Sequence, residues 1–266
     1  MILSSSCLEI ALNKPSQFFY IEKYKPNFYR LRNFYLYIML VSLEELAQNA
    51  VHFGHKTSRW NPKMKKYIYS ATNGVHVFDL NKTAEGLKNT VVELEKLAKK
   101  GKTILFVSTK PQTKVMLEEF RESTGYPIVV NKWVGGMMTN FETIKGRIKK
   151  MKNIETMITT GEVDKYTKKE QSKLRKELEK LQDAFDGIRD LHKAPDAMFI
   201  VDGKRDINAI KEAQRLNIPV LGIADTNVNP DDYTTLIPAN DDAISSLAYI
   251  LSFVFEAADN NPKYTK

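Results

Sequence analysis

Three short apolar runs decide the fold of this chain: Thr103-Ile-Leu-Phe-Val107, Met198-Phe-Ile-Val201 and Pro219-Val-Leu-Gly-Ile-Ala224. Nearly continuous runs of this kind are typical of strands that are buried on both faces of a parallel sheet. Amphipathic segments that predict helices lie around them, at residues 82–100, 111–124, 206–216 and 241–258. Two shorter strands are expected, at residues 128–130 and 235–237. The alternation predicts an α/β domain whose parallel sheet carries helices on both faces.

The segment before the first of these runs predicts a helix and a hairpin. Ser42 is a good N-cap, and Glu45 three residues later would complete a capping box. We expect this helix to end at the glycine of Val51-His-Phe-Gly-His55. Two short strands should follow, at residues 67–71 and 75–80, because Asn73-Gly74 between them is a hairpin signal.

Residues 142–191 interrupt the alternation of strands and helices. Apolar residues recur there at helical spacing in two sets, and the second set, from Leu174 to Leu191, is nearly a heptad seam. Gly161 and a polar stretch join the two sets. The pattern predicts an antiparallel coiled-coil hairpin inserted into the α/β domain. The domain would then comprise residues 42–141 and 192–266, with residues 142–191 as the insertion.

Residues 1–41 differ in composition from the rest of the chain. Nine aromatic residues lie within residues 1–38, without strand alternation or a helical stripe. The order of a signal peptide is missing, and a match to a transit peptide is weak because there are only two arginines. We interpret the segment as an N-terminal extension, with Met39 as a working start favoured over a genuine leader.

Composition excludes several classes of protein. The chain has 266 residues and a net charge of +8, and its single cysteine excludes a disulfide framework and a Cys-based zinc site. Its longest apolar run, residues 34–41, is too short to span a bilayer. The charge is polarised, from +6 over residues 42–141 to −5 over residues 194–266. This polarity favours one basic face and a polyanionic partner over scattered solvated lysines.

Sequence motifs of catalysis are missing. There is no Gly-rich dinucleotide fingerprint, no phosphate-loop lysine motif and no nucleophile elbow. His52 and His55 could share a metal, but no third ligand follows at a fixed spacing, so we expect them to cap a helix or pack beneath a loop. We also expect Asn240 or Asp241 to cap the last helix, and for Asp241 and Asp242 we favour capping over metal binding. An enzyme using the crevice at the carboxyl ends of the strands, where Ser108-Thr109 could hold a phosphate, is a weaker alternative.

The segment Lys56-Thr-Ser-Arg-Trp-Asn-Pro-Lys-Met-Lys-Lys66 is the main candidate binding site. Five of its side chains should contact phosphates: Lys56, Arg59, Lys63, Lys65 and Lys66. Trp60 could stack on an exposed base, or it could anchor the loop to the core. A second group of basic residues is equally open to solvation or to polyanion binding: Lys132, Lys145, Arg147, Lys149 and Lys150.

Several blocks of sequence resemble the bacterial small-subunit ribosomal protein two family. They include His52-Phe-Gly-His55, Arg59-Trp-Asn-Pro-Lys-Met64, Asn73-Gly-Val-His-Val-Phe-Asp-Leu80 and Trp133-Val-Gly-Gly-Met-Met-Thr-Asn140. Ile218-Pro-Val220, Asp225-Thr-Asn227 and Pro238-Ala-Asn-Asp-Asp-Ala243 match in the same order. The resemblance covers residues 42–258, and it marks His52, Gly54, His55, Trp133, Gly135 and Gly136 as structural motif residues. Trp133 should be an anchor, because Gly135 and Gly136 allow close backbone approach.

The resemblance implies a flavodoxin-like domain with a protruding coiled-coil hairpin and no catalysis. It implies a structural constituent of the small ribosomal subunit that binds small-subunit rRNA, contacts other small-subunit proteins and helps to recruit ribosomal protein one. It implies no cofactor, no small-molecule substrate and no membrane. The expected location is the bacterial cytoplasm, with an organellar ribosome as the minor alternative. A protein-only adaptor built on the helical hairpin is a further alternative.

Overall fold

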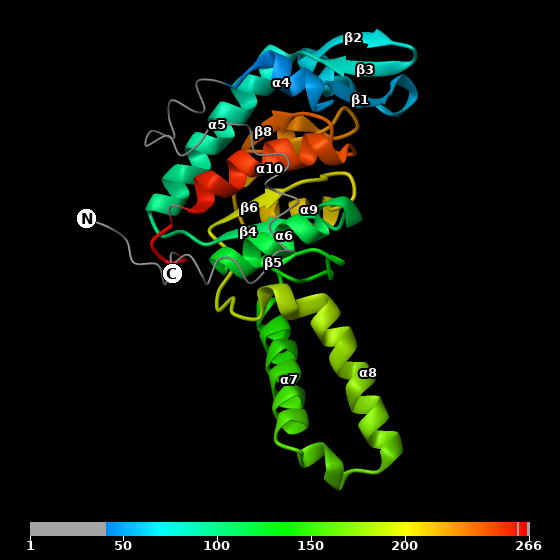
Figure 1. The fold of residues 1–266 in the computed structure, drawn as a ribbon, viewed down its shortest axis with the longest axis vertical. Coiled ribbons are helices and arrows are strands. Elements are labelled where there is room, and N and C mark those ends of the chain that lie inside the picture. Colours follow the sequence, from blue (N-terminus) through cyan, green and yellow to red (C-terminus); the bar gives the residue numbers. More distant parts are fainter. Residues whose placement is uncertain (1–40, 260, 265–266) are drawn as a thin grey trace, which may run out of the picture.

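A five-stranded parallel sheet forms the centre of the protein (Figure 1). The computed structural model describes residues 41–259 and 261–264. The strands are β4 (Ile104–Val107), β5 (Ile128–Val129), β6 (Ala197–Ile200), β7 (Val220–Ala224) and β8 (Thr235–Pro238). Their spatial order is β5-β4-β6-β7-β8, which is the flavodoxin-like order, with the switch point between β4 and β6. The α/β fold class predicted from the apolar runs is confirmed.

Helices cover both faces of this sheet because side chains alternate along each strand. Phe106 and Phe199 point into a core with α5 (Leu80–Lys99), α6 (Pro111–Thr124) and α10 (Ile244–Asp259). Leu105, Val107 and Met198 point into a second core with α9 (Ile207–Arg215). All four strand residues of β4 are buried, as a strand between two layers of helices requires.

A small antiparallel sheet carries the N-terminal part of the described chain. Its strands are β1 (Phe53–Lys56), β2 (Ile68–Thr72) and β3 (Val75–Phe78), in the order β1-β3-β2. The hairpin turn between β2 and β3 places Asn73 at φ 52° and Gly74 at φ 76°, the left-handed pair that Asn-Gly favours. Two 3-10 turns connect β1 to β2: η1 (Thr57–Arg59) and η2 (Pro62–Tyr67).

Two long helices extend from the sheet domain at the end away from this small sheet (Figure 1). They are α7 (Phe141–Thr159) and α8 (Lys168–Phe185), with the short turn η3 (Glu162–Lys165) between them and η4 (Asp186–Ile188) after α8. Ile148 and Met151 of α7 are buried in one cluster with Leu181 and Phe185 of α8. The assignment of residues 142–191 as a separate insertion stays a prediction, as do the other domain boundaries.

The first helix differs from the expectation. It is α4 (Leu43–Gln48), and Ser42 caps it by accepting a hydrogen bond from the backbone N of Glu44 at 3.2 Å. The predicted capping box is wrong, because the carboxylate of Glu45 accepts a hydrogen bond from the Tyr249 hydroxyl at 2.9 Å instead. The predicted end at Gly54 is also wrong: the helix ends at Gln48, and Gly54 lies in β1.

The predicted N-terminal extension, residues 1–41, lies outside the described residues except for Val41. Within residues 41–259 and 261–264, no helix has the length and apolar character needed to cross a membrane. The short turn η5 (Pro230–Asp232) completes the elements of the described chain that matter for the site.

Candidate functional site

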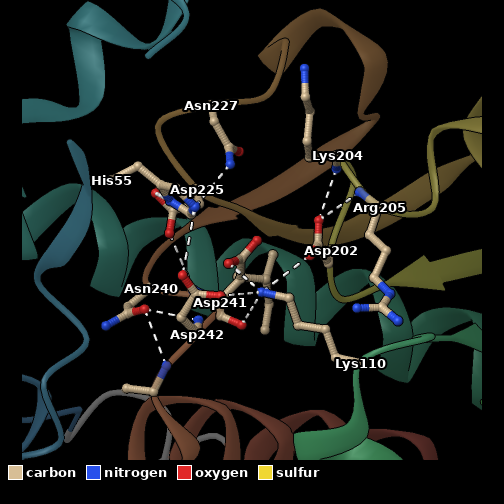
Figure 2. A network of polar contacts seen from close by, with 12 residues as sticks. His55, Lys110, Asp202, Lys204, Arg205, Asp225, Asn227, Asn240, Asp241 and Asp242 are labelled. Atoms are coloured by element: carbon tan, nitrogen blue, oxygen red, sulfur yellow. Dashed lines mark hydrogen bonds and ion pairs between the residues drawn. The ribbon is translucent and has the colours of Figure 1, made fainter. Parts of the chain in front are cut away.

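A buried polar cluster lies at the carboxyl ends of the central strands (Figure 2). Lys110, just after β4, is only 6% exposed. Its ammonium lies 2.6 Å from Asp241 Oδ1, 2.7 Å from Asp242 Oδ1 and 3.1 Å from Asp202 Oδ2. It also donates to the backbone carbonyl of Asp241 at 2.6 Å. One buried cation therefore joins the ends of β4, β6 and β8.

His55 links β1 to the same cluster. Its Nδ1 lies 3.0 Å from Asp225 Oδ1, and its Nε2 lies 3.6 Å from Asp242 Oδ2. The hydrogen bond to Asp225, helped by the negative charges around it, raises the pKa of His55. Burial, together with the negative charges of Asp225 and Asp202, raises the pKa of Asp241. The imidazolium and the Lys110 ammonium thus balance a group of closely spaced carboxyls.

Ligand atoms of His55, Asp241 and Asp242 lie within 4.8 Å of one another, a spacing that could hold a divalent cation. In the described arrangement the Lys110 ammonium contacts both carboxylates and supplies the positive charge. The carboxylates of Asp241 and Asp242 do not cap the last helix, because they contact Lys110; the alternative expected cap, Asn240, provides the side-chain acceptor there. Before α10, Asn240 Oδ1 accepts hydrogen bonds from the backbone N of Asp242 at 2.9 Å and of Ala243 at 3.3 Å.

The expected phosphate site at Ser108 and Thr109, just after β4, is occupied by a carboxylate of the protein. The backbone N and the hydroxyl of Thr109 donate to the carboxylate of Asp206, at 3.1 and 2.9 Å. Asp206 is 2% exposed, and the Ser108 hydroxyl accepts a hydrogen bond from Thr113. The idea that Ser108 and Thr109 hold a phosphate is therefore wrong, because a carboxylate of the protein occupies the anion's place. The backbone N and the hydroxyl of Thr109 are therefore already hydrogen-bonded within the protein.

Neither motif histidine caps α4. The cap position is Asn49, and the ring of His52 packs on Phe53 with ring centroids 4.1 Å apart. Burial lowers the pKa of His52. The alternative expectation, packing beneath the basic loop, describes His55 better, because its backbone N donates to Thr226 Oγ1 at 3.0 Å. Gly54 allows this approach, since a Cβ there would lie 2.6 Å from Thr226 Cγ2.

The basic segment 56–66 is a structured surface, held from below. The backbone N of Asn61 donates to Thr226 O at 2.7 Å, and Asn61 Oδ1 accepts from Lys63 N at 3.0 Å, capping η2. Met64 is fully buried. Trp60 is half-buried, with its ring 5.0 Å from that of His76, so both of its expected roles, anchor and stacking surface, stay open. These contacts leave the basic side chains on the outside.

The five basic side chains of this segment are all exposed. Lys63 forms an ion pair with Asp231 at 2.5 Å, and Lys66 lies 5.0 Å from the centre of the Tyr67 ring. Within the part of the chain that the structure describes, Lys56, Arg59 and Lys65 belong to no ion pair. A positive surface therefore exists here, with one of its charges partly neutralised. Phosphate binding by these residues stays a prediction.

The second group of basic candidates is mostly paired with acids. Lys132 lies 4.0 Å from Asp183, Lys145 lies 2.8 Å from Glu142, and Lys150 forms an ion pair with Glu177. Arg147 and Lys149 are exposed on α7, and no ion pair within residues 41–259 and 261–264 involves them. Three of these five side chains therefore have an acidic partner within the protein, and the role of the group in binding stays a prediction.

The Trp133 loop is held by a residue that the sequence did not single out, Glu212 on α9. Its buried carboxylate accepts hydrogen bonds from Trp133 Nε1 at 3.0 Å and from three backbone N atoms at 2.8–3.0 Å, those of Gly136, Met138 and Thr139. Trp133 is thus tied down as expected. The expected close approach at Gly135 is wrong, because a Cβ there would meet nothing within 4 Å, whereas Gly136 is needed for its φ of 83°.

The sequence did not predict that two aromatic side chains, Phe53 and Tyr69, would be exposed. Phe53 on β1 is 47% exposed and Tyr69 on β2 is 78% exposed. Both lie in the small sheet that carries the basic segment. Side chains alternate between the two faces of a strand, so each strand has an outer face. The sequence alone does not show which aromatic residues lie on that face.

Comparison with known proteins identifies relatives over most of the chain. The family model described as ribosomal protein S2 matches residues 46–261. The small ribosomal subunit protein uS2 of Fusobacterium nucleatum is 47% identical over 219 residues, covering 82% of this chain and 89% of the relative. The proteins of the same name from Rippkaea orientalis and Thermus thermophilus are each 45% identical. These alignments cover 82% and 80% of this chain, and 81% and 83% of the relatives.

Proposed function

The chain belongs to the ribosomal protein S2 family, and from this premise we propose that it binds small-subunit rRNA through the basic segment 56–66 as a structural constituent of the small ribosomal subunit. The family is one of structural ribosomal proteins and not of enzymes. The protein would act in the cytoplasm of a bacterium, with an organellar ribosome as the alternative.

The single observation that supports rRNA binding is the contrast between two polar regions. In the cluster around Lys110 the charges are buried and paired with one another. In the segment 56–66 the basic side chains are exposed, and only Lys63 has a carboxylate partner among the described residues. Exposed lysines and arginines on a firmly held backbone bind phosphates and release counterions. Trp60 beside them is half-buried, and its ring is a candidate for stacking on a base.

The test is rRNA binding by a variant with three neutralised lysines: Lys56→Gln, Lys65→Gln and Lys66→Gln. Lys63 is left in place because its loss would leave Asp231 unpaired. We expect at least tenfold weaker binding of a small-subunit rRNA transcript and a salt dependence that is lower by about 2–3 in log–log slope. The control variant replaces three other lysines with glutamine: Lys88 on α5, Lys100 just after α5, and Lys211 on α9. Equal affinity and slope for both variants would refute the assignment.

We also propose that the protein helps to recruit ribosomal protein one, through Phe53 and Tyr69. Aromatic residues are enriched at the centres of protein interfaces, and these two are exposed on one small sheet. Small subunits carrying Phe53→Ser and Tyr69→Ser should retain less ribosomal protein one on sedimentation. Val115→Ser and Leu216→Ser change two other exposed apolar side chains, 54% and 40% exposed, and serve as the control. Equal retention by both variants would remove the proposed contact.

A further inference from the structure

Helix α8 carries a row of four lysines, which we call the α8 lysine row: Lys169, Lys173, Lys176 and Lys180. All four side chains are exposed. They are spaced by four, three and four residues, so at 3.6 residues per turn they fall within an arc of about 60° and along about 16 Å of helix. One side of α8 is therefore a continuous line of positive charge.

The row faces away from the partner helix. Leu181 and Phe185 are the buried residues of α8, and Leu174 and Leu178 pack beside them. The same helical geometry places this apolar stripe about 140° from the lysine row. Since the hairpin extends away from the sheet domain (Figure 1), the side of α8 that bears the row is open to a partner.

The acids of α8 leave the row largely unneutralised. Glu170, one turn before Lys173, accepts hydrogen bonds from the backbone N and hydroxyl of Thr167 in a capping box. Glu177 pairs with Lys150, and Asp183 pairs with Lys132. Among the residues that the structure describes, no ion pair includes a lysine of the row. Glu179, which is exposed, lies on the flank, about 90° away around the helix.

Like charges at these spacings repel one another and weaken an isolated helix. Such a row is stabilised when a linear polyanion lies along it. The apolar residues of α8 are turned toward α7, so the row lacks the apolar border that an interfacial membrane helix needs. On α7, by comparison, Lys145, Lys150 and Lys152 are paired with carboxylates. Arg147 and Lys149 on the same helix belong to no ion pair among the described residues.

We propose that the α8 lysine row binds the phosphate backbone of RNA, as a second contact separate from the basic segment 56–66. Lysine ammonium groups bind phosphates as point charges, and no base is read, so binding is independent of sequence. The inference rests on the proposed function, since it takes the partner to be the rRNA. The two surfaces lie at opposite ends of the molecule (Figure 1), so each raises the effective concentration of RNA at the other.

The experiment measures binding of the full chain to a small-subunit rRNA transcript over a series of salt concentrations. The test variant replaces the four lysines of the row with glutamine, and a second variant replaces them with arginine. The control variant makes the same change of charge at Lys88, Lys96, Lys100 and Lys211. We expect the glutamine variant to bind at least tenfold more weakly, with a log–log salt slope lower by about 3. The arginine variant and the control should stay within twofold of the wild type.

Each outcome decides the matter. Removing like charges relieves repulsion in α8, so the glutamine variant should melt at or above the wild-type temperature, and weaker binding then reports lost contacts. If its affinity and slope match the wild type while the 56–66 variant binds weakly, the row is a solvated face and this inference fails alone. If RNA binding is unchanged but incorporation into small subunits falls, the row meets a protein and the inference is overturned. If the wild type itself shows no salt-dependent binding, the proposed function fails with it.

Discussion

The indole Nε1 of Trp133 donates a 3.0 Å hydrogen bond to Glu212, a residue 79 positions later in the chain. The same carboxylate accepts three backbone hydrogen bonds from the loop that leads into α7. One side chain of the sheet domain therefore holds the root of the helical hairpin.

Replacing Glu212 should destabilise the whole protein. Glu212→Gln puts amide hydrogens against backbone donors, so we expect a loss of about 1–3 kcal/mol in the free energy of unfolding. Glu212→Ala leaves all the donors unpaired and should cost more. Urea denaturation measures both, and Glu93→Gln, at an exposed ion pair with Lys96 on α5, is the matched control. A loss no larger than that of the control would contradict the role of this carboxylate.

The stability should depend on pH through the same residue. Burial by itself would raise the pKa of Glu212, but the hydrogen bonds from Trp133 and the loop backbone outweigh it and lower the pKa. A carboxyl with a lowered pKa stabilises the fold when ionised, above its ordinary pKa of about 4.3, and this contribution disappears as the pH falls through the lowered value. The difference in unfolding free energy between wild type and Glu212→Gln should therefore shrink below about pH 4. A constant difference from pH 7 to pH 3 would refute the prediction.

The buried ammonium of Lys110 should be essential for folding. Lys110→Met leaves the carboxyls of Asp202, Asp241 and Asp242 without their shared cation. We expect a loss of about 3–5 kcal/mol in unfolding free energy, because a buried charge loses its partner. Lys114→Met, on the exposed side of α6 near Glu118, should change it by less than about 1 kcal/mol. Chemical denaturation of both variants makes the comparison, and similar midpoints would count against the cluster.

The two glycines of the Trp133 loop should respond differently to alanine. Gly136 has a φ of 83°, where a Cβ is strained, whereas Gly135 has open space around its Cα. Gly136→Ala should cost about 1–2 kcal/mol in unfolding free energy, and Gly135→Ala should be neutral or slightly stabilising. Thermal melts of the two variants test this directly. Equal effects would mean that the pair acts through something other than backbone conformation.

The strands and helices were predictable because their signals are local. The interior positions of the runs Thr103–Val107 and Pro219–Ala224 are all apolar. Such strands are stable when helices bury both of their faces. The hairpin at Asn73-Gly74 needed only two adjacent residues. The same holds for the periodic stripes of α7 and α8. The sequence motifs that indicated the family are also local, because each consists of adjacent residues.

The fate of each charge was decided by the tertiary structure. Lys110 and Asp241 are 131 residues apart in the chain, and Thr109 and Asp206 are 97 apart, so no local pattern could show that they would meet. For this reason the sequence suggested a phosphate site at Thr109, where the carboxylate of Asp206 lies. It also suggested Asp241 as a possible helix cap, whereas Asp241 contacts the ammonium of Lys110. By itself the sequence determined the fold class, the family and an excess of positive charge. Which lysines remain free for a polyanion depends on which acids the fold brings beside them, because a charge is neutralised by its neighbours in space.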